Sequence, residues 1–80
     1  MVTKMTGQTT TVLRHLHHRG SISPMEALIT YGIMRLAARI YDLRLMGHNI
    51  VTHIKQDEGG HRYARYDYQP EGRDSEVRQP

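Results

Sequence analysis

Two arginines four residues apart carry the most specific chemistry in this chain, within RLAARIYDLRLMGHNI at residues 35–50. On a helix, Arg35 and Arg39 lie one turn apart, about 6 Å along the axis, and Asp42 can pair with Arg39. An arginine fork matches the two major-groove acceptors of guanine, O6 and N7. Ala38 leaves room for a close approach or for a thymine methyl group. The spacing predicts contact with duplex DNA, and a solvated face with a surface ion pair is the alternative.

Four further side chains are candidates for contact with backbone phosphate. Thr30 and Tyr31 lie beside a glycine turn and carry hydroxyl donors, although Tyr31 fits packing equally well. Lys55 and Arg62 flank the tip of a predicted hairpin. The acidic residues 57–58 at that tip would be repelled by phosphate. Contact of the hairpin with DNA and contact with a protein partner therefore both stay open.

No arrangement of residues in the chain predicts catalysis, a metal or a cofactor. His15 and His18 share one side of a predicted helix, but two histidines make an incomplete metal site, and the chain has no cysteine. No paired acids or Ser/His/Asp set stand on a framework that could hold them, and Gly59-Gly60 fits a hairpin turn rather than a phosphate loop. The sequence predicts a binding protein and not an enzyme.

Composition limits the partners. Eighty residues correspond to one small domain. The net charge of +3 is uneven, because residues 1–68 hold nine Lys and Arg against five acids, whereas residues 69–80 hold two against three. A modestly basic body permits a polyanionic partner. No segment has the length and hydrophobicity of a membrane span or a signal peptide, so we expect a cytoplasmic protein without membrane contact.

The elements that must position these residues follow from local signals. A first helix is expected after a cap at Thr6 or Thr9 and ends at Gly20. Its inward side carries Val12, Leu13 and Leu16. A short bridge of strand follows at residues 21–23.

The stretch Ser23-Pro24-Met25-Glu26 predicts the start of a second helix. Ser23 fits the N-cap, Pro24 the first helical position, and Glu26 the third position of a capping box. This helix should run to about Tyr31, with Ala27 and Leu28 turned inward, and Gly32 should end it.

A third helix is expected over residues 34–46. Its wheel groups Leu36, Ile40 and Leu43 on one side, opposite the arginines and Met46, with Tyr41 between the two faces. Beyond Gly47, alternating residues at 48–55 and 61–68 predict a two-stranded hairpin with its tip at Gly59-Gly60. Tyr66 and Tyr68 should close the core. The expected organisation is a flexible arm at 1–8, one domain at 9–68 and a disordered tail at 69–80.

These residues resemble a family of small winged helix-turn-helix DNA-binding proteins found in phages and prophages. The resemblance covers about residues 8–68. The segments that carry it are Arg39-Ile40-x-x-Leu43-x-x-x-Gly47-x-x-Ile50, GSISPMEALITYGIMRLAARIYDLRLMGHNIV and GGHRYARYDY. It implies an α+β fold of three helices plus a C-terminal two-stranded β-hairpin wing. It also implies sequence-specific binding of double-stranded DNA, with helix 34–46 in the major groove, by a phage-type transcriptional regulator or excision-accessory factor.

A winged helix used as a protein-binding module is the alternative, for example a phage-encoded, anti-defence type inhibitor of a host protein complex. That reading predicts an exposed apolar patch around Met34, Ala38 and Met46, where methionines make an adaptable surface. A homodimer is open under either reading, since paired winged domains read two half-sites.

Overall fold

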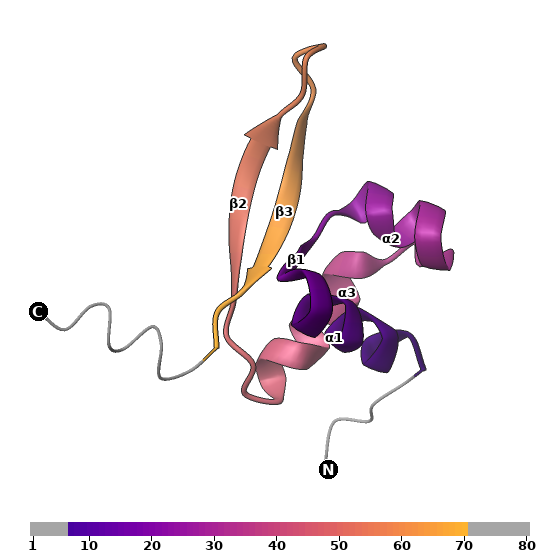
Figure 1. Cartoon of the computed structure of the whole chain (residues 1–80), viewed down its shortest axis with the longest axis vertical. Helices are drawn as coiled ribbons and strands as arrows, with labels where there is room; N and C mark the ends of the chain where they lie inside the picture. The colour runs from indigo at the N-terminus through magenta and orange to yellow at the C-terminus, as the bar shows by residue number, and fades with distance from the viewer. Residues whose placement is uncertain (1–6, 71–80) are drawn as a thin grey trace, which may run out of the picture.

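Three helices and three strands make up the described part of the chain, residues 7–70, in this computed structural model (Figure 1). Their bounds are α1 (Gly7–Arg19), β1 (Ser21–Ile22), α2 (Pro24–Tyr31), α3 (Leu36–Leu45), β2 (Ile50–Gln56) and β3 (Arg62–Tyr68). This order confirms the predicted α+β winged helix-turn-helix arrangement. Most of the predicted arm and tail, residues 1–6 and 71–80, lies outside the described residues. Within residues 7–70, no helix combines the length and hydropathy of a bilayer span.

The start and end of α2 confirm the predicted capping signals. The Ser23 hydroxyl accepts a hydrogen bond from the Glu26 amide at 3.2 Å, and the Glu26 carboxylate accepts one from the Ser23 amide at 3.1 Å. Pro24 occupies the first turn, where a missing N–H costs nothing. Gly32 ends the helix in the left-handed conformation at φ +71°, which other residues adopt only with strain.

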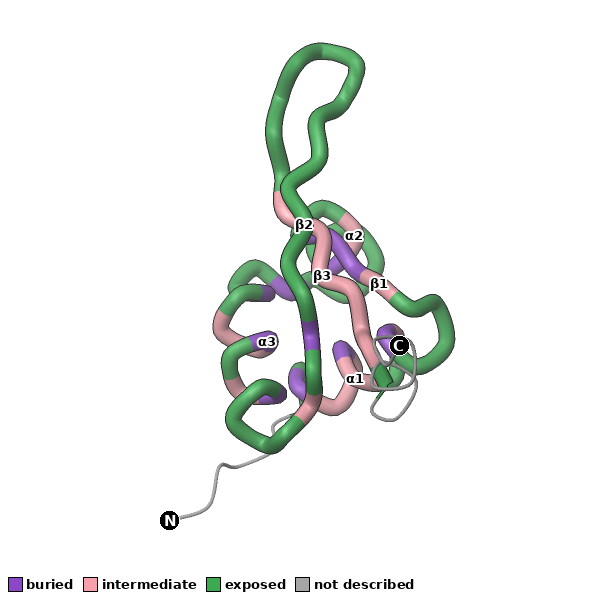
Figure 2. Tube along the Cα trace, turned by 90° about the vertical axis from the view of Figure 1, so that its left-hand side faces the viewer, coloured by how far each residue is buried: buried purple, intermediate pink, exposed green. Residues whose placement is uncertain are grey.

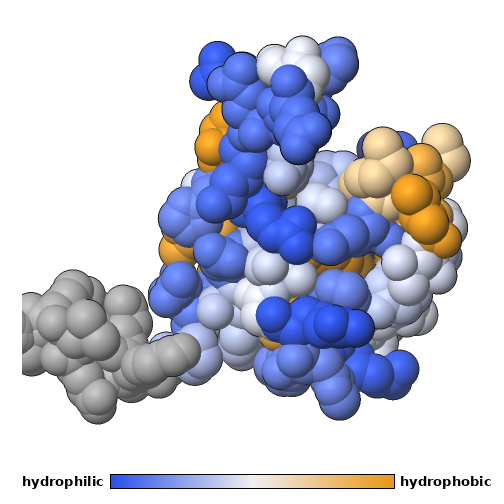
Figure 3. Space-filling model, turned by 45° about the horizontal axis from the view of Figure 1, so that its top comes forward, coloured by the Kyte–Doolittle hydropathy of each residue, from blue (hydrophilic) through white to orange (hydrophobic). Residues whose placement is uncertain are grey.

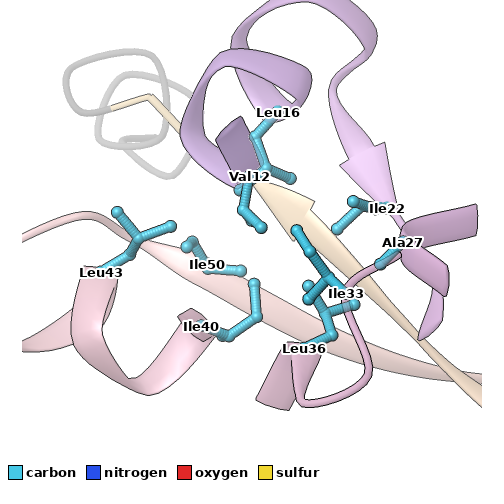
Figure 4. Close-up of a cluster of buried hydrophobic side chains, with 9 residues drawn as sticks. All are labelled: Val12, Leu16, Ile22, Ala27, Ile33, Leu36, Ile40, Leu43 and Ile50. Atoms are coloured by element: carbon cyan, nitrogen blue, oxygen red, sulfur yellow. The ribbon is translucent and has the colours of Figure 1, made fainter. Parts of the chain in front are cut away.

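The core lies where the three helices meet the base of the sheet, and its side chains point toward one another (Figure 4). Every element except β3 contributes a buried apolar residue. The set is Val12, Leu16, Ile22, Ala27, Ile33, Leu36, Ile40, Leu43 and Ile50. Tyr66 and Tyr68 of β3 are half-buried against it, as the strand alternation predicted. Ile33, in the turn between α2 and α3, is a core residue that was not predicted from the sequence.

The first helix begins earlier than predicted. It starts at Gly7, so residues 7–8 are helical rather than part of an arm. Thr9 is not a cap but a fully buried residue of the first turn, and its hydroxyl donates to the Asp42 carboxylate at 3.4 Å. The other proposed cap, Thr6, lies outside the described residues. Thr9 is tolerated at this buried position because α1 packs on α3, where Asp42 accepts its hydrogen bond.

The predicted inward position of Leu28 is wrong, because 45% of its surface is exposed. The eight-residue α2 buries only Ala27 of the apolar residues on its surface, since the small body covers one side of it alone. The third helix is also shorter than the predicted 34–46. It begins at Leu36, because residues 33–35 are taken up by the turn and Arg35 becomes its N-cap.

The sheet has the order β1-β3-β2, so the short β1 and the long β2 are its edges. Ile50 pairs with Tyr68 and Gln56 with Arg62, which confirms the hairpin. Beyond buried Ile50, every residue of β2 is exposed, and the far half of the hairpin stands clear of the body (Figure 2). The fold therefore presents a projecting arm, which borders the start of α2.

Candidate nucleic-acid interface

The side of α3 that faces away from the core is largely apolar. Because Leu36, Ile40 and Leu43 point inward, a rotation of 100° per residue places Ala38, Tyr41 and Leu45 on the outer side, with Ala37 at its edge beside Arg44. Tyr41 is 61% and Leu45 57% exposed. This set, Ala37, Ala38, Tyr41 and Leu45, is called the outer face of α3 below.

Arg35 lies at the N-terminal end of the outer face. It is exposed, and its side chain makes no hydrogen bond or ion pair with any part of residues 7–70. Together with Ala38 and Tyr66 it lines an open hollow of about 320 Å³ between the starts of α2 and α3 and the sheet. Its guanidinium is therefore available to an anionic ligand.

Arg39 and Asp42, which the sequence placed beside Arg35, lie on the flank of α3 that packs on α1. Arg39 Nε donates to Asp42 Oδ2 at 3.1 Å, and the two side chains are only 23% and 21% exposed. The same carboxylate oxygen accepts the Thr9 hydroxyl of α1. The predicted ion pair is confirmed. The two arginines are not equally exposed, however, because Arg39 is half-buried and Arg35 is exposed.

Arg44 lies on the opposite flank of α3 and is not among the residues predicted for the interface. Its Nε and Nη2 donate to the carbonyl oxygen of Ile50 at 3.0 and 2.7 Å, and Nη2 also donates to the Thr52 hydroxyl at 2.9 Å. No local signal marks this role, because its partners belong to the next element. The guanidinium joins the end of α3 to the start of the hairpin.

Lys55 and Arg62 lie near the hairpin tip but on opposite faces of the sheet. Side chains alternate along a strand, so Arg62 shares the face of Tyr66, which points to the helices. Lys55 pairs with Tyr63 and shares the other face. Both cations are exposed and have no side-chain partner within residues 7–70. Of these two cations, Arg62 lies on the same side of the sheet as Arg35, and Lys55 lies on the other side.

One of the two acidic side chains at the hairpin tip shapes the turn. Asp57 Oδ1 accepts hydrogen bonds from the amides of Gly59 and His61 at 2.9 and 2.8 Å, and His61 Nδ1 lies 3.4 Å from it. This carboxylate is therefore occupied in shaping the turn. Glu58 is the one acidic side chain there that is left to solvent among the described residues.

Thr30 and Tyr31 line a different hollow, of about 380 Å³, between α1 and α2. The Tyr31 hydroxyl lies 2.7 Å from His15 Nδ1, and the two rings meet edge to face with centroids 5.5 Å apart. Tyr31 thus has a packing role between α1 and α2. Thr30 is exposed at the rim of this hollow.

Within residues 7–70, two of the acids are paired with arginines and two more lie beside histidines, whereas most of the cations have no side-chain partner. Residues 7–70 hold eight Lys and Arg against five Asp and Glu. Four of the five acids have a positively charged or histidine partner: Glu26 with Arg65, Asp42 with Arg39, Asp57 with His61 and Asp67 with His53. In this part of the chain, five cations have no side-chain partner: Arg14, Arg19, Arg35, Lys55 and Arg62. The charge left over at the surface is positive.

A second surface feature is apolar and lies on α2. Met25, Leu28 and Ile29 are 63%, 45% and 73% exposed, and Met34 in the following turn is 81% exposed. Figure 3 shows this hydrophobic surface at the end of the molecule where α2 lies. Of the patch predicted for a protein-binding module, Met34 and Met46 are confirmed as exposed, at 81% and 36%, while Ala38 is half-buried. In the described part of the chain, no three His, Asp or Glu side chains come together as a metal site would require.

Comparison with protein families gives one match. A family model described as a winged helix-turn-helix domain matches residues 7–67, which is most of the chain. Searches of the curated proteins and of the solved structures gave no significant match.

Proposed function

Because this chain belongs to the winged helix-turn-helix domain family, we propose that it binds duplex DNA sequence-specifically, with α3 in the major groove. The family is one of DNA-binding modules, and the proposed role is binding without catalysis or a cofactor. The observation that carries the proposal is the positive charge left after internal pairing. Polyanions recruit such unpaired Lys and Arg by releasing counterions.

Arg35 is the leading candidate for a DNA contact. It is exposed at the end of α3 that enters the groove in helix-turn-helix proteins, and no side chain competes for it. Arg62, on the helix-facing side of the hairpin, is proposed to contact the same duplex. Arg39, held by Asp42, is proposed to act at a flank through its remaining guanidinium nitrogens. Lys55 and the Thr30 hydroxyl are proposed to contact phosphate outside the groove.

The narrower role follows the resemblance to phage proteins. We propose a transcriptional regulator or excision-accessory factor that acts in the cytoplasm of an infected or lysogenic bacterium. Two copies on neighbouring half-sites fit this role, because dimers of helix-turn-helix proteins read two half-sites about one helical turn apart. The stoichiometry of the complex on its preferred duplex tests the homodimer.

Fluorescence anisotropy across a salt series tests DNA binding. One duplex has a random sequence, and the other is the DNA upstream of the gene for this chain. We expect affinity that falls steeply with salt and prefers the upstream duplex. Arg35→Ala should reduce the slope of log affinity against log salt by about 1 and weaken the preference. Arg14→Ala, which removes an equal unpaired charge from α1, is the matched control and should keep the preference.

A protein-binding module is the second candidate function, and the exposed apolar residues of α2 favour it. Large exposed apolar patches are uncommon on monomeric proteins and often mark sites of contact with another protein. Under this proposal the chain inhibits a host protein complex by docking Met25, Ile29 and Met34. Absence of binding to both duplexes at low salt would exclude the DNA proposal and leave this one.

A further inference from the structure

The outer face of α3 offers no arginine fork to a base edge. Arg39 and Arg44 lie on the two flanks of the helix, where Asp42 and the Ile50 carbonyl hold them. The one acid of α3, Asp42, is likewise bound on its flank. Between these flanks lie the exposed Ala37, Tyr41 and Leu45 and the half-buried Ala38.

Apolar side chains have one partner in the major groove, which is the 5-methyl group of thymine. Ala37 and Ala38 are small, so the helix can approach the base edges closely. Tyr41 and Leu45, one turn apart, extend further and are 61% and 57% exposed. The same four residues have nothing to donate to or accept from guanine except the tyrosine hydroxyl.

We propose that α3 recognises thymine methyl groups through its outer face and that the chain therefore prefers A·T-rich sites. This rests on the proposed function, because it concerns how the bound duplex is read. Charge favours DNA over a protein as the occupant. Arg35 stands unpaired at one end of the outer face, Arg62 faces the same side from the hairpin, and the outer face itself carries no acid.

Deoxyuridine substitution isolates the methyl group, because uracil keeps the hydrogen-bonding groups of thymine and lacks only the methyl. The preferred duplex is first selected from a random pool with the native chain. Anisotropy then compares that duplex made with thymine and with deoxyuridine. Loss of one fully buried methyl should weaken binding about fourfold, so two or more contacted thymines should give a loss of tenfold or more.

Two variants connect the effect to α3. Tyr41→Gln removes an exposed apolar group of the outer face, and we expect it to bring the thymine-to-uracil affinity ratio toward one. Ile29→Gln is the matched control, since it removes an apolar group of α2 that is 73% exposed, against 61% for Tyr41, and should leave the ratio unchanged. Circular dichroism melting shows that each variant is folded before the ratios are compared.

The possible outcomes distinguish failure of methyl recognition from failure of DNA binding itself. A native chain that binds both duplexes equally overturns methyl recognition while DNA binding stands. Selected sites rich in guanine, with binding lost on 7-deazaguanine, overturn it in favour of an arginine contact to guanine N7. Absence of binding to any duplex at low salt overturns the proposed function, and this inference with it.

Discussion

The guanidinium of Arg44 in α3 donates two hydrogen bonds, 3.0 and 2.7 Å long, to the carbonyl oxygen of Ile50 at the start of β2. The hairpin register explains why that oxygen is available. The backbone N–H of Gln69 donates to the carbonyl oxygen of Asn49, and the backbone N–H of Asp57 donates to the carbonyl oxygen of His61. The odd-numbered residues of β2 therefore direct their backbone groups to β3. The groups of Ile50 point to the open edge of the sheet. Arg44 closes the base of this edge and fixes α3 to the hairpin.

Loss of this link should lower stability. We expect Arg44→Gln to reduce the free energy of unfolding by about 1–2 kcal/mol, because a charged donor is removed from a half-buried carbonyl. Arg44→Lys should not restore it fully, since an ammonium cannot present the planar fork. Urea denaturation measures both, with Arg14→Gln as a control that should change little. Equal stability of Arg44→Gln and the native chain would contradict the role.

The turn between α2 and α3 should depend on Ile33 and not on its neighbour. Ile33 is 2% exposed, whereas Met34 is 81% exposed. Ile33→Ala leaves a cavity and should cost about 2–5 kcal/mol, a large part of the stability of so small a domain. Met34→Ala should be close to neutral. Thermal melting of the pair gives the comparison, and similar losses in both would refute this assignment of the core.

The capping box should behave as one unit. Ser23→Ala removes the acceptor for the Glu26 amide and should cost about 1 kcal/mol. Glu26→Ala should cost a similar amount, since it removes the reciprocal bond and the carboxylate that Arg65 Nη2 contacts at 3.1 and 3.0 Å. Because both changes break the same motif, the double variant should lose less than the sum of the two. Additive losses in urea denaturation would argue against reciprocal capping.

Two variants of Asp57 test the charge of the hairpin tip and the shape of its turn separately. Asp57→Asn keeps an oxygen for the amides of Gly59 and His61 but removes the negative charge. Where the tip approaches phosphate, we expect this variant to bind duplex DNA a few-fold more tightly and to melt as the native chain does. Asp57→Ala loses the acceptor and should raise amide exchange at the tip. Unchanged affinity in Asp57→Asn would show that the tip stays clear of the duplex.

Local signals in the sequence predicted the elements well. Ser23, Pro24 and Glu26 start α2, Gly32 ends it, and alternation around Gly59-Gly60 produces the hairpin; the structure confirms each of these. Each depends on backbone conformation and on residues a few positions away, which is the range that a sequence pattern describes. The winged helix-turn-helix fold follows from the order of these elements.

The direction in which an individual side chain points depended on tertiary contacts. Asp42 is drawn to a flank by Thr9, 33 residues away, and Arg65 reaches Glu26 across 39 residues. A helical wheel gives relative angles only, so it could not say that Arg39 lies beside α1 while Tyr41 faces outward.

The sequence by itself thus determined the elements, their order and the net positive charge of this protein. Packing decided which cations stay unpaired and which face of α3 is free. The physical reason is that hydrogen bonding and burial of a side chain are set by neighbours that folding brings together from distant positions.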